Sequence, residues 1–160
     1  MAQVSPLKPT HKALKKYYED LKAYSAQRVE HEGALETAFS RLLADTARPH
    51  GWTLIPKLSL KVRGKSIAPD GTLRDGFNLQ RGFWEAKDTH DDLDDEIRKK
   101  IAKGYPLSNI IFEDTRQAVL YQNGREINRF NLHDPQKLAD LLNDFYAWTE
   151  PQHEQQRNSR

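Results

Sequence analysis

The sequence contains no cysteine among its 160 residues. This absence excludes disulfide scaffolds, cysteine–zinc sites and thiol nucleophiles, and it suits a reducing cytoplasm. No apolar run approaches the roughly 20 residues that a membrane-spanning helix needs, and the N-terminus lacks the apolar stretch of a signal peptide. We therefore expect a cytoplasmic protein that does not associate with a membrane.

Neither sign of charge is in clear excess, because 25 basic and 23 acidic residues give a formal net charge of +2. Such a balance neither requires nor excludes a nucleic-acid partner. The length suffices for one ordinary domain but not for two well-formed cores. We expect a flexible lead-in over residues 1–9, a single domain over 10–150 and a disordered tail over 151–160.

The spacing of apolar residues predicts the order of the secondary-structure elements. Helices are expected over 10–24, with Thr10 as N-cap, over 29–46, over 91–103, and from Asp134-Pro135 onward. Strands are expected over 52–62, 71–74, 79–87, 109–112, 118–121 and 126–132. This order predicts one mixed β-sheet flanked by helices, an α/β domain at the borderline with α+β.

The most informative stretch is Trp84-Glu85-Ala86-Lys87-Asp88, at the end of a predicted strand. Because side chains alternate between the two faces of a strand, Glu85 and Lys87 should project from the same side. Trp84 and Ala86 should then face the opposite side and pack under a helix.

A second carboxylate, Asp70, follows Pro69 and precedes Glu85 by one predicted hairpin. If the connection is centred between Phe77 and Asn78, antiparallel pairing puts Asp70 opposite Glu85. If a tight turn on Asp75-Gly76 joins the strands instead, the two carboxylates separate by several residues. The sequence leaves both registers open.

Two carboxylates beside a lysine suit a hard divalent cation such as Mg²⁺, for which one or two protein carboxylates are enough. Such a metal acidifies a bound water and neutralises charge on a scissile phosphate, while the lysine orients the nucleophile. The alternative to a metal site is that Glu85 and Lys87 form an exposed pair on an edge strand, beside an aspartate in a turn. The chain would then be a small α/β interaction domain.

Pro69-Asp70, a hairpin and Glu85-Ala86-Lys87 together resemble the signature of the PD-(D/E)XK nuclease superfamily. The chain is most similar to the N-terminal nuclease domains of restriction-modification enzymes that carry nuclease and methylase on one polypeptide (type I-like and single-polypeptide ISP types). The likeness covers roughly residues 30–124, and four segments carry it: Glu32–Leu43, Pro69-Asp70, Gly82–Asp88 and Pro106–Ile111.

The chain departs from that family pattern at two places. The helix after Lys87, where the family often has a glutamine, carries Arg98, Lys99 and Lys100. Gly71 follows Asp70 where an apolar residue is usual. Gly71 therefore suggests that the strand predicted over residues 71–74 begins irregularly.

The resemblance implies a restriction-endonuclease-like fold and a Mg²⁺-dependent DNA endonuclease, with Mn²⁺ as a substitute metal. Asp70, Glu85 and the backbone carbonyl of Ala86 are the expected metal ligands, and Lys87 is expected to orient the attacking water. The expected partners are DNA and methylase, specificity or helicase domains on the same or a longer chain. The alternative is a catalytically inactive DNA-binding or docking module of the same fold.

The resemblance also implies an acidic residue on the first core helix, where Glu32 and Glu36 are the candidates. At ~100° per residue, Glu32 lies about 50° and Glu36 about 90° from the centre of the apolar stripe. We therefore favour Glu32 as the fourth catalytic residue. The alternative, equally consistent with the sequence, is that Glu32 lies in the first turn only to complement the helix dipole.

The remaining charged residues give weaker indications. Lys99, Lys100 and Lys103 lie at the end of a predicted helix, where they either complement its dipole or contact DNA phosphates. A second basic cluster consists of Lys57, Lys61, Arg63 and Lys65, and it is equally consistent with solvated surface or phosphate contacts. Asp75 is expected to be a turn residue, and Asp88 to orient the site or cap the next helix. The six histidines show no metal-ligand spacing.

Overall fold

The structure is a computed structural model that describes residues 4–27 and 32–151, without the side chain of Glu32. Its helices are α1 (Lys12–Ala26), α2 (Glu32–Ala47), the short 3-10 turn η1 (Arg48–His50), α3 (Leu93–Ala102) and α4 (Pro135–Tyr146). Its strands are β1 (Thr53–Pro56), β2 (Leu60–Val62), β3 (Lys65–Ile67), β4 (Gly71–Arg74), β5 (Gln80–Ala86), β6 (Asn109–Glu113), β7 (Gln117–Gln122) and β8 (Arg125–Asn131).

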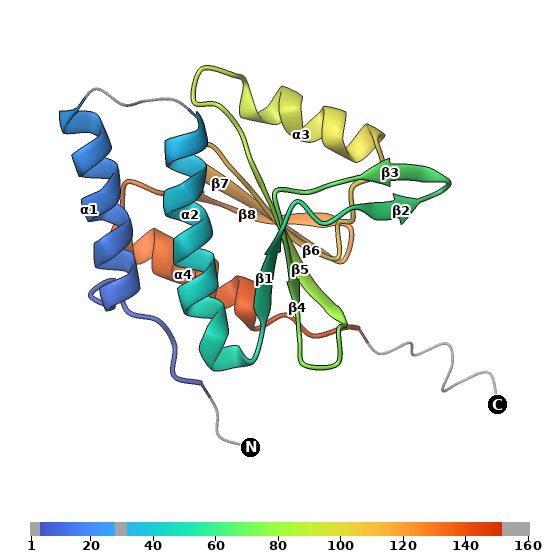
Figure 1. The fold of residues 1–160 in the computed structure, drawn as a ribbon, viewed down its shortest axis with the longest axis horizontal. Coiled ribbons are helices and arrows are strands. Elements are labelled where there is room, and N and C mark those ends of the chain that lie inside the picture. The colour runs from blue at the N-terminus through green and yellow to red at the C-terminus, as the bar shows by residue number, and fades with distance from the viewer. Residues whose placement is uncertain (1–3, 28–31, 152–160) are drawn as a thin grey trace.

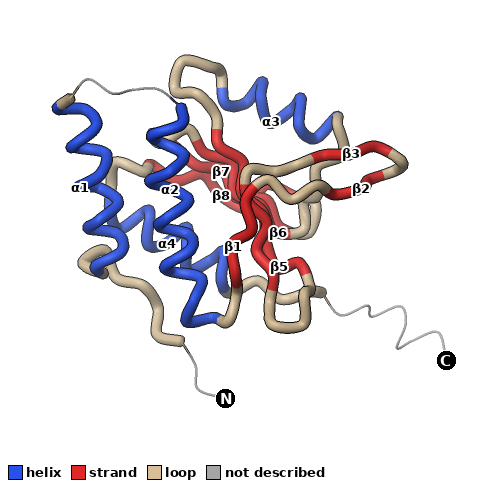
Figure 2. Tube along the Cα trace, in the orientation of Figure 1, coloured by secondary structure: helices blue, strands red, loops and turns tan. Residues whose placement is uncertain are grey.

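Six of these strands form one mixed sheet in the order β1-β4-β5-β6-β7-β8. The β5–β6 pair is parallel, with α3 as its crossover, and the other neighbouring pairs are antiparallel. Helices α1, α2 and α4 lie on one face, while α3 and the separate β2–β3 hairpin lie on the other (Figures 1 and 2). The predicted mixed sheet flanked by helices is confirmed.

Two hydrophobic clusters hold these layers together. The larger cluster joins α1, α2 and α4 to the sheet through residues such as Tyr17, Phe39, Trp84 and Phe145. The smaller cluster fixes α3 and the hairpin, and it includes Ile67, Phe83, Leu93, Ile97 and Tyr105. The alternation along β5 is therefore as predicted, since Trp84 packs with α2 while its neighbour Phe83 packs toward α3.

The prediction of a single strand over residues 52–62 is wrong. Lys57 has a left-handed backbone, with φ of 54°, and it separates β1 from β2. Strand β2 pairs only with β3, which the periodicity missed because it is three residues long. The sequence feature that indicates this hairpin is Arg63-Gly64. These two residues form its turn, with φ values of 51° and 80°.

Helix ends follow local capping chemistry, with two corrections. His11 rather than Thr10 caps α1, since its Nδ1 accepts a hydrogen bond from the Ala13 N–H. Asp92 rather than Asp88 caps α3, and Asp88 accepts from the His90 N–H in the preceding loop. Gly104 follows α3 with a left-handed backbone, and Asn123-Gly124 forms the turn between β7 and β8. The start of α4 at Asp134-Pro135 agrees with prediction, since Asp134 caps this helix.

The two chain ends were predicted to lack fixed structure. Within the lead-in, Leu7 exchanges hydrogen bonds of 2.7 and 3.0 Å with the Asn143 side chain of α4. Residues 152–160 of the predicted tail and 29–31 of the predicted second helix lie outside the described residues. Among the described helices, not one combines the length and the apolar character needed to cross a membrane.

Candidate active site

The connection between β4 and β5 decides the register of the two candidate carboxylates. The Asp75 carboxylate accepts hydrogen bonds from the N–H groups of Phe77 and Leu79, so the turn spans residues 75–79. Gly71 consequently pairs with Trp84, which places Asp70 opposite Glu85. The register centred between Phe77 and Asn78 is the one adopted, and Asp75 is a turn residue as predicted.

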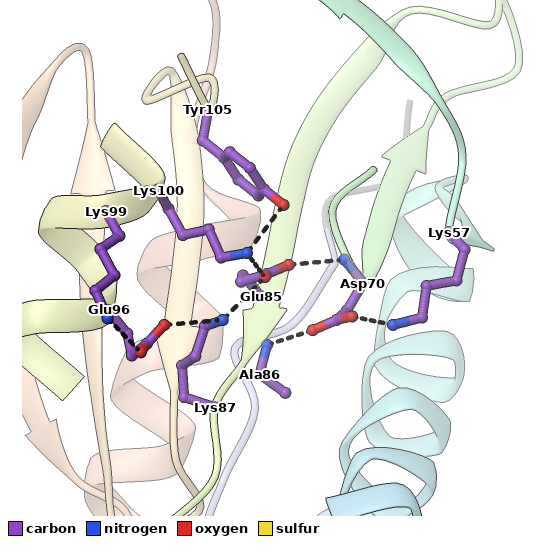
Figure 3. A network of polar contacts seen from close by, with 9 residues as sticks. All are labelled: Lys57, Asp70, Glu85, Ala86, Lys87, Glu96, Lys99, Lys100 and Tyr105. Carbon is purple, nitrogen blue, oxygen red and sulfur yellow. Dashed lines mark hydrogen bonds and ion pairs between the residues drawn. The ribbon is translucent and has the colours of Figure 1, made fainter. Parts of the chain in front are cut away.

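Asp70 and Glu85 are both buried, with relative exposures of 8% and 4%. Each carboxylate accepts one backbone hydrogen bond from the opposite strand. The Asp70 N–H donates to Glu85 Oε1 over 3.0 Å, and the Ala86 N–H donates to Asp70 Oδ2 over 2.7 Å. Figure 3 shows the two carboxylates side by side at the end of β5.

Steric crowding explains why a glycine stands at position 71, where the chain departs from the family pattern. A Cβ atom at this position would lie 2.6 Å from Leu54 Cδ1 and 2.9 Å from Trp84 Cε3. Trp84 itself stacks on Phe39 of α2, with ring centroids 5.5 Å apart. The close approach of this indole leaves no room for a side chain beside Asp70.

Three lysines surround the two carboxylates. Lys87 Nζ lies 3.5 Å from Glu85 Oε2 and 3.4 Å from Glu96 Oε2, so Lys87 and Glu85 share one side as predicted. Lys100 Nζ lies 3.1 Å from the same Glu85 oxygen. On the other flank, Lys57 Nζ donates to Asp70 Oδ1. Each carboxylate therefore presents one oxygen to the backbone and the other to an ammonium group.

The inward positions of Lys100 and Glu96 were missed, although the sequence contains a signal for both. Lys100 was expected at the helix surface, but its side chain is only 14% exposed and also contacts Tyr105 Oη at 3.5 Å. Both residues lie three positions after apolar residues of α3, Leu93 and Ile97, and thus on its buried face. Lys99, by contrast, is 67% exposed and pairs with Glu96, and Lys103 is exposed.

The proximity of these charges shifts several pKa values. Burial, and then the charge of Asp70, raise the pKa of Glu85 against the opposing effect of Lys100 and Lys87. Burial disfavours the charged form of Lys57, but the hydrogen bond and charge of Asp70 outweigh it and raise the Lys57 pKa. Burial likewise opposes ionisation of Glu96, yet Lys87 and Lys99 together lower its pKa. Burial and neighbouring charges thus act in opposite directions on the pKa of each of these three groups.

A hollow of about 330 Å³ adjoins Asp70, and Glu36, Lys57 and Trp84 are among the residues that line it. Glu36 is also close enough to contribute to the raised pKa of Lys57. The structure thus brings Glu36 to the site, whereas the side chain of Glu32, the favoured candidate, lies outside the described residues. The apolar stripe of α2 packs against α1 as well as against the sheet. The choice of Glu32 over Glu36 stays a prediction.

The donor set fits a hard cation. Asp70 and Glu85 supply carboxylate oxygens, and Mg²⁺ needs only one or two of these because it keeps several waters. Over residues 4–27 and 32–151, no group of three or more histidine, aspartate and glutamate residues could hold a metal ion. A metal at this site would therefore depend on the Asp70–Glu85 pair, with backbone oxygens and water completing its coordination.

No family model and no curated protein matches this chain. Among solved structures, the chain is 44% identical to part of DrdV, seen by electron cryomicroscopy in complex with DNA, with a TM-score of 0.84. That match covers 88% of this chain but only 14% of DrdV. A DUF820 protein from Anabaena variabilis, presented as a candidate nuclease, matches 60% of this chain and 64% of its own at 10% identity and a TM-score of 0.44. The DrdV match confirms that this α/β domain has a restriction-endonuclease-like fold.

Proposed function

We propose that this chain is a metal-dependent DNA endonuclease domain of PD-(D/E)XK type, the cleavage module of a restriction-modification system. The observation that carries the proposal is the pairing of Asp70 with Glu85 beside Lys87. This constellation lies in a chain that is 44% identical to part of DrdV, a protein solved in complex with DNA.

In this proposal Asp70, Glu85 and the Ala86 carbonyl bind Mg²⁺, and Mn²⁺ can replace it. When bound, the metal would lower the pKa of a coordinated water and offset charge on the scissile phosphate. The backbone N–H groups of Asp70 and Ala86 fix one oxygen of each carboxylate, which leaves the second oxygen free to turn from lysine to metal. Glu36, at the edge of the same hollow, would add negative charge.

Lys87 is proposed to orient the attacking water and to stabilise the negative charge that develops on the phosphate. Its ammonium is held between Glu85 and Glu96, so it is already aimed at the end of β5 where the phosphate would lie. Lys99 of α3 and Lys103, the residue after this helix, are exposed and remain candidates for phosphate contacts.

The proposed partners are duplex DNA and further domains that carry methylation, specificity or helicase functions. The chain spans 14% of the length of DrdV, so the corresponding region of that protein is one part of a much larger polypeptide.

A nicking assay on supercoiled plasmid tests the proposal directly. Wild-type protein should nick DNA with Mg²⁺ or Mn²⁺ and stop when EDTA is added. Asp70→Asn should abolish nicking, while the control Asp45→Asn, an acid on α2 whose side chain is 41% exposed, should not. Persistent nicking by Asp70→Asn, or nicking in EDTA, would refute the assignment.

A second candidate function is a non-cleaving DNA-binding or docking module. The observation in its favour is that Lys57 and Lys100 already neutralise the free oxygens of Asp70 and Glu85. If this ion network is purely structural, DNA binding should persist in EDTA and no divalent metal should produce nicking.

A further inference from the structure

The β2–β3 hairpin forms a two-stranded sheet of its own, separate from the six-stranded sheet. It projects from the body of the molecule beside α3 (Figure 1). Two-stranded hairpins are marginally stable by themselves, so a projecting one needs contacts that hold it in place.

Those contacts come from the inner side of the hairpin. Ile67 is buried in the smaller hydrophobic cluster, and Leu60 and Val62 pack against that cluster. A Cβ atom at Gly104, just after α3, would lie 3.2 Å from Val62 Cγ1, so the end of α3 closely approaches the hairpin. The hairpin is therefore fixed relative to α3.

Around its turn, over residues 61–66, the hairpin carries positive charge only. Lys61, Arg63 and Lys65 are exposed, and residues 46–69 contain no aspartate or glutamate. Within the described part of the chain, no carboxylate forms an ion pair with any of these three cations, whereas Arg98 and Lys99 of α3 pair with acids of their own helix. The hairpin thus presents cations that are not neutralised by the protein.

The hairpin is an insertion between two residues of the candidate site. It begins after Lys57 and ends before Asp70, which contact each other. Tyr105 connects its base to the site, because Tyr105 belongs to the same cluster as Ile67 and contacts Lys100. At about 3.3 Å per residue, the Arg63-Gly64 turn lies within roughly 20 Å of Asp70 along the strand.

We propose that this hairpin is a phosphate-binding arm, on which Lys61, Arg63 and Lys65 contact the backbone of duplex DNA beside the cleavage site. The inference rests on the proposed nuclease function and adds the surface that holds its substrate. Since duplex DNA rises 3.4 Å per base pair, contacts within ~20 Å fall within about six base pairs of the scissile phosphate. Such contacts fix the position of the duplex without selecting its sequence.

The test compares two triple variants of the full chain that lose the same number of charges. One carries Lys61→Gln, Arg63→Gln and Lys65→Gln, and the control carries Lys8→Gln, Lys12→Gln and Lys15→Gln. The control residues are exposed on the N-terminal segment and α1, on the opposite side of the molecule (Figure 1). Binding to a 30-base-pair duplex of arbitrary sequence is measured by fluorescence anisotropy with Ca²⁺ between 50 and 200 mM KCl.

Three lost phosphate contacts should lower the slope of log affinity against log salt by about two to three units in the hairpin variant. Its affinity at 100 mM salt should fall by roughly tenfold or more, while the control changes less than about twofold. The charge-conserving variant Lys61→Arg, Arg63→Lys and Lys65→Arg should restore the wild-type slope. Failure of this variant to restore it would show that loss of folding, rather than of charge, explains the result, and would overturn the proposal.

The two proposals fail in different ways. If wild-type protein neither binds nor nicks DNA, the proposed function fails and the hairpin proposal fails with it. If wild-type protein nicks DNA but the hairpin and control variants bind it equally, only the hairpin proposal is overturned. Polyglutamate carries negative charge but has no phosphodiester backbone. If the hairpin variant loses binding to polyglutamate as strongly as binding to DNA, the arm is assigned to acidic polypeptides and the hairpin proposal is also overturned.

Discussion

Two buried acidic pairs lie at neighbouring strand ends, and they differ in what contacts them. Asp70 and Glu85 lie at the end of β5, while Glu113 and Asp114 lie at the end of β6, where Glu113 pairs with Ala86. Glu113 Oε2 accepts from Trp84 Nε1 over 2.9 Å, and its Oε1 accepts from the Thr115 N–H over 2.8 Å. Both oxygens of Glu113 are thus occupied by groups that cannot move away.

The Asp70–Glu85 pair has only half of its oxygens fixed in this way. The free oxygens contact lysine ammonium groups, and the Lys57 side chain is 60% exposed beside the hollow. Burial raises the pKa of both Glu113 and Glu85, so a shifted pKa alone does not distinguish the two regions. The two regions differ in whether a metal ion could displace the group that now contacts a carboxylate oxygen. A lysine side chain beside Asp70 or Glu85 can be displaced, whereas the partners of Glu113 cannot.

The largest effect that this comparison predicts is on cleavage. Lys87→Ala should lower the single-turnover cleavage rate by about 10²–10³-fold, the usual cost of losing one electrostatic group at a transition state. It should leave Mn²⁺ binding, measured by calorimetry, nearly unchanged because both carboxylates remain. Asp70→Asn should instead weaken Mn²⁺ binding itself, since an amide oxygen carries no charge. Normal cleavage by Lys87→Ala with weaker DNA binding would make Lys87 a phosphate contact.

The next effect is on stability, and it should appear in the other acidic pair. Glu113→Ala leaves the buried Trp84 Nε1 and the Thr115 N–H without their acceptor, which should lower the free energy of unfolding by about 2–4 kcal/mol. Glu85→Gln should cost clearly less, because its amide can still accept from the Asp70 N–H. Urea denaturation of both variants provides the measurement, and equal losses would show that the two pairs are equally structural.

A change of pH by one unit should have a smaller effect on the free energy of unfolding. Burial raises the pKa of Glu113 to about 8 in the folded state, above its ordinary value of 4.5. A raised carboxyl pKa means that the folded state retains a proton which the unfolded state loses, so this contribution is full below pH 4.5 and decreases as the pH rises toward 8. Wild-type protein should lose roughly 1 kcal/mol per pH unit over this window relative to Glu113→Gln. Thermal unfolding of both proteins at pH 5, 6 and 7 tests the sign, and parallel curves would contradict it.

The smallest effect concerns the acid on α2. Glu36→Gln should weaken metal-dependent cleavage by no more than about fivefold, because a partly exposed charge contributes less than about 1 kcal/mol. Glu32→Gln serves as the comparison, and a larger loss for Glu32 would show that Glu32, rather than Glu36, is the helix acid of the site. Cleavage rates at limiting Mg²⁺ would show the difference most clearly.

Local sequence rules predicted much of the fold and part of the site. Strand alternation placed Glu85 and Lys87 on one side and Trp84 on the other, and capping chemistry located the start of α4 at Asp134-Pro135. These features depend on residues only a few positions apart, so backbone geometry determines them. The same rules failed where a left-handed residue, Lys57, interrupts an otherwise regular strand pattern.

The tertiary structure decided which charges meet. Lys57 reaches Asp70 across 13 residues of sequence, and Lys100 reaches Glu85 from a helix on one face of the sheet. The register between Asp70 and Glu85 likewise depended on how the Asp75 carboxylate closes its turn. The sequence by itself determined the types of groups and the side of the strand that they occupy. Only packing determined their distances, because an ion pair between segments far apart in sequence depends on how helices and strands assemble around a common core.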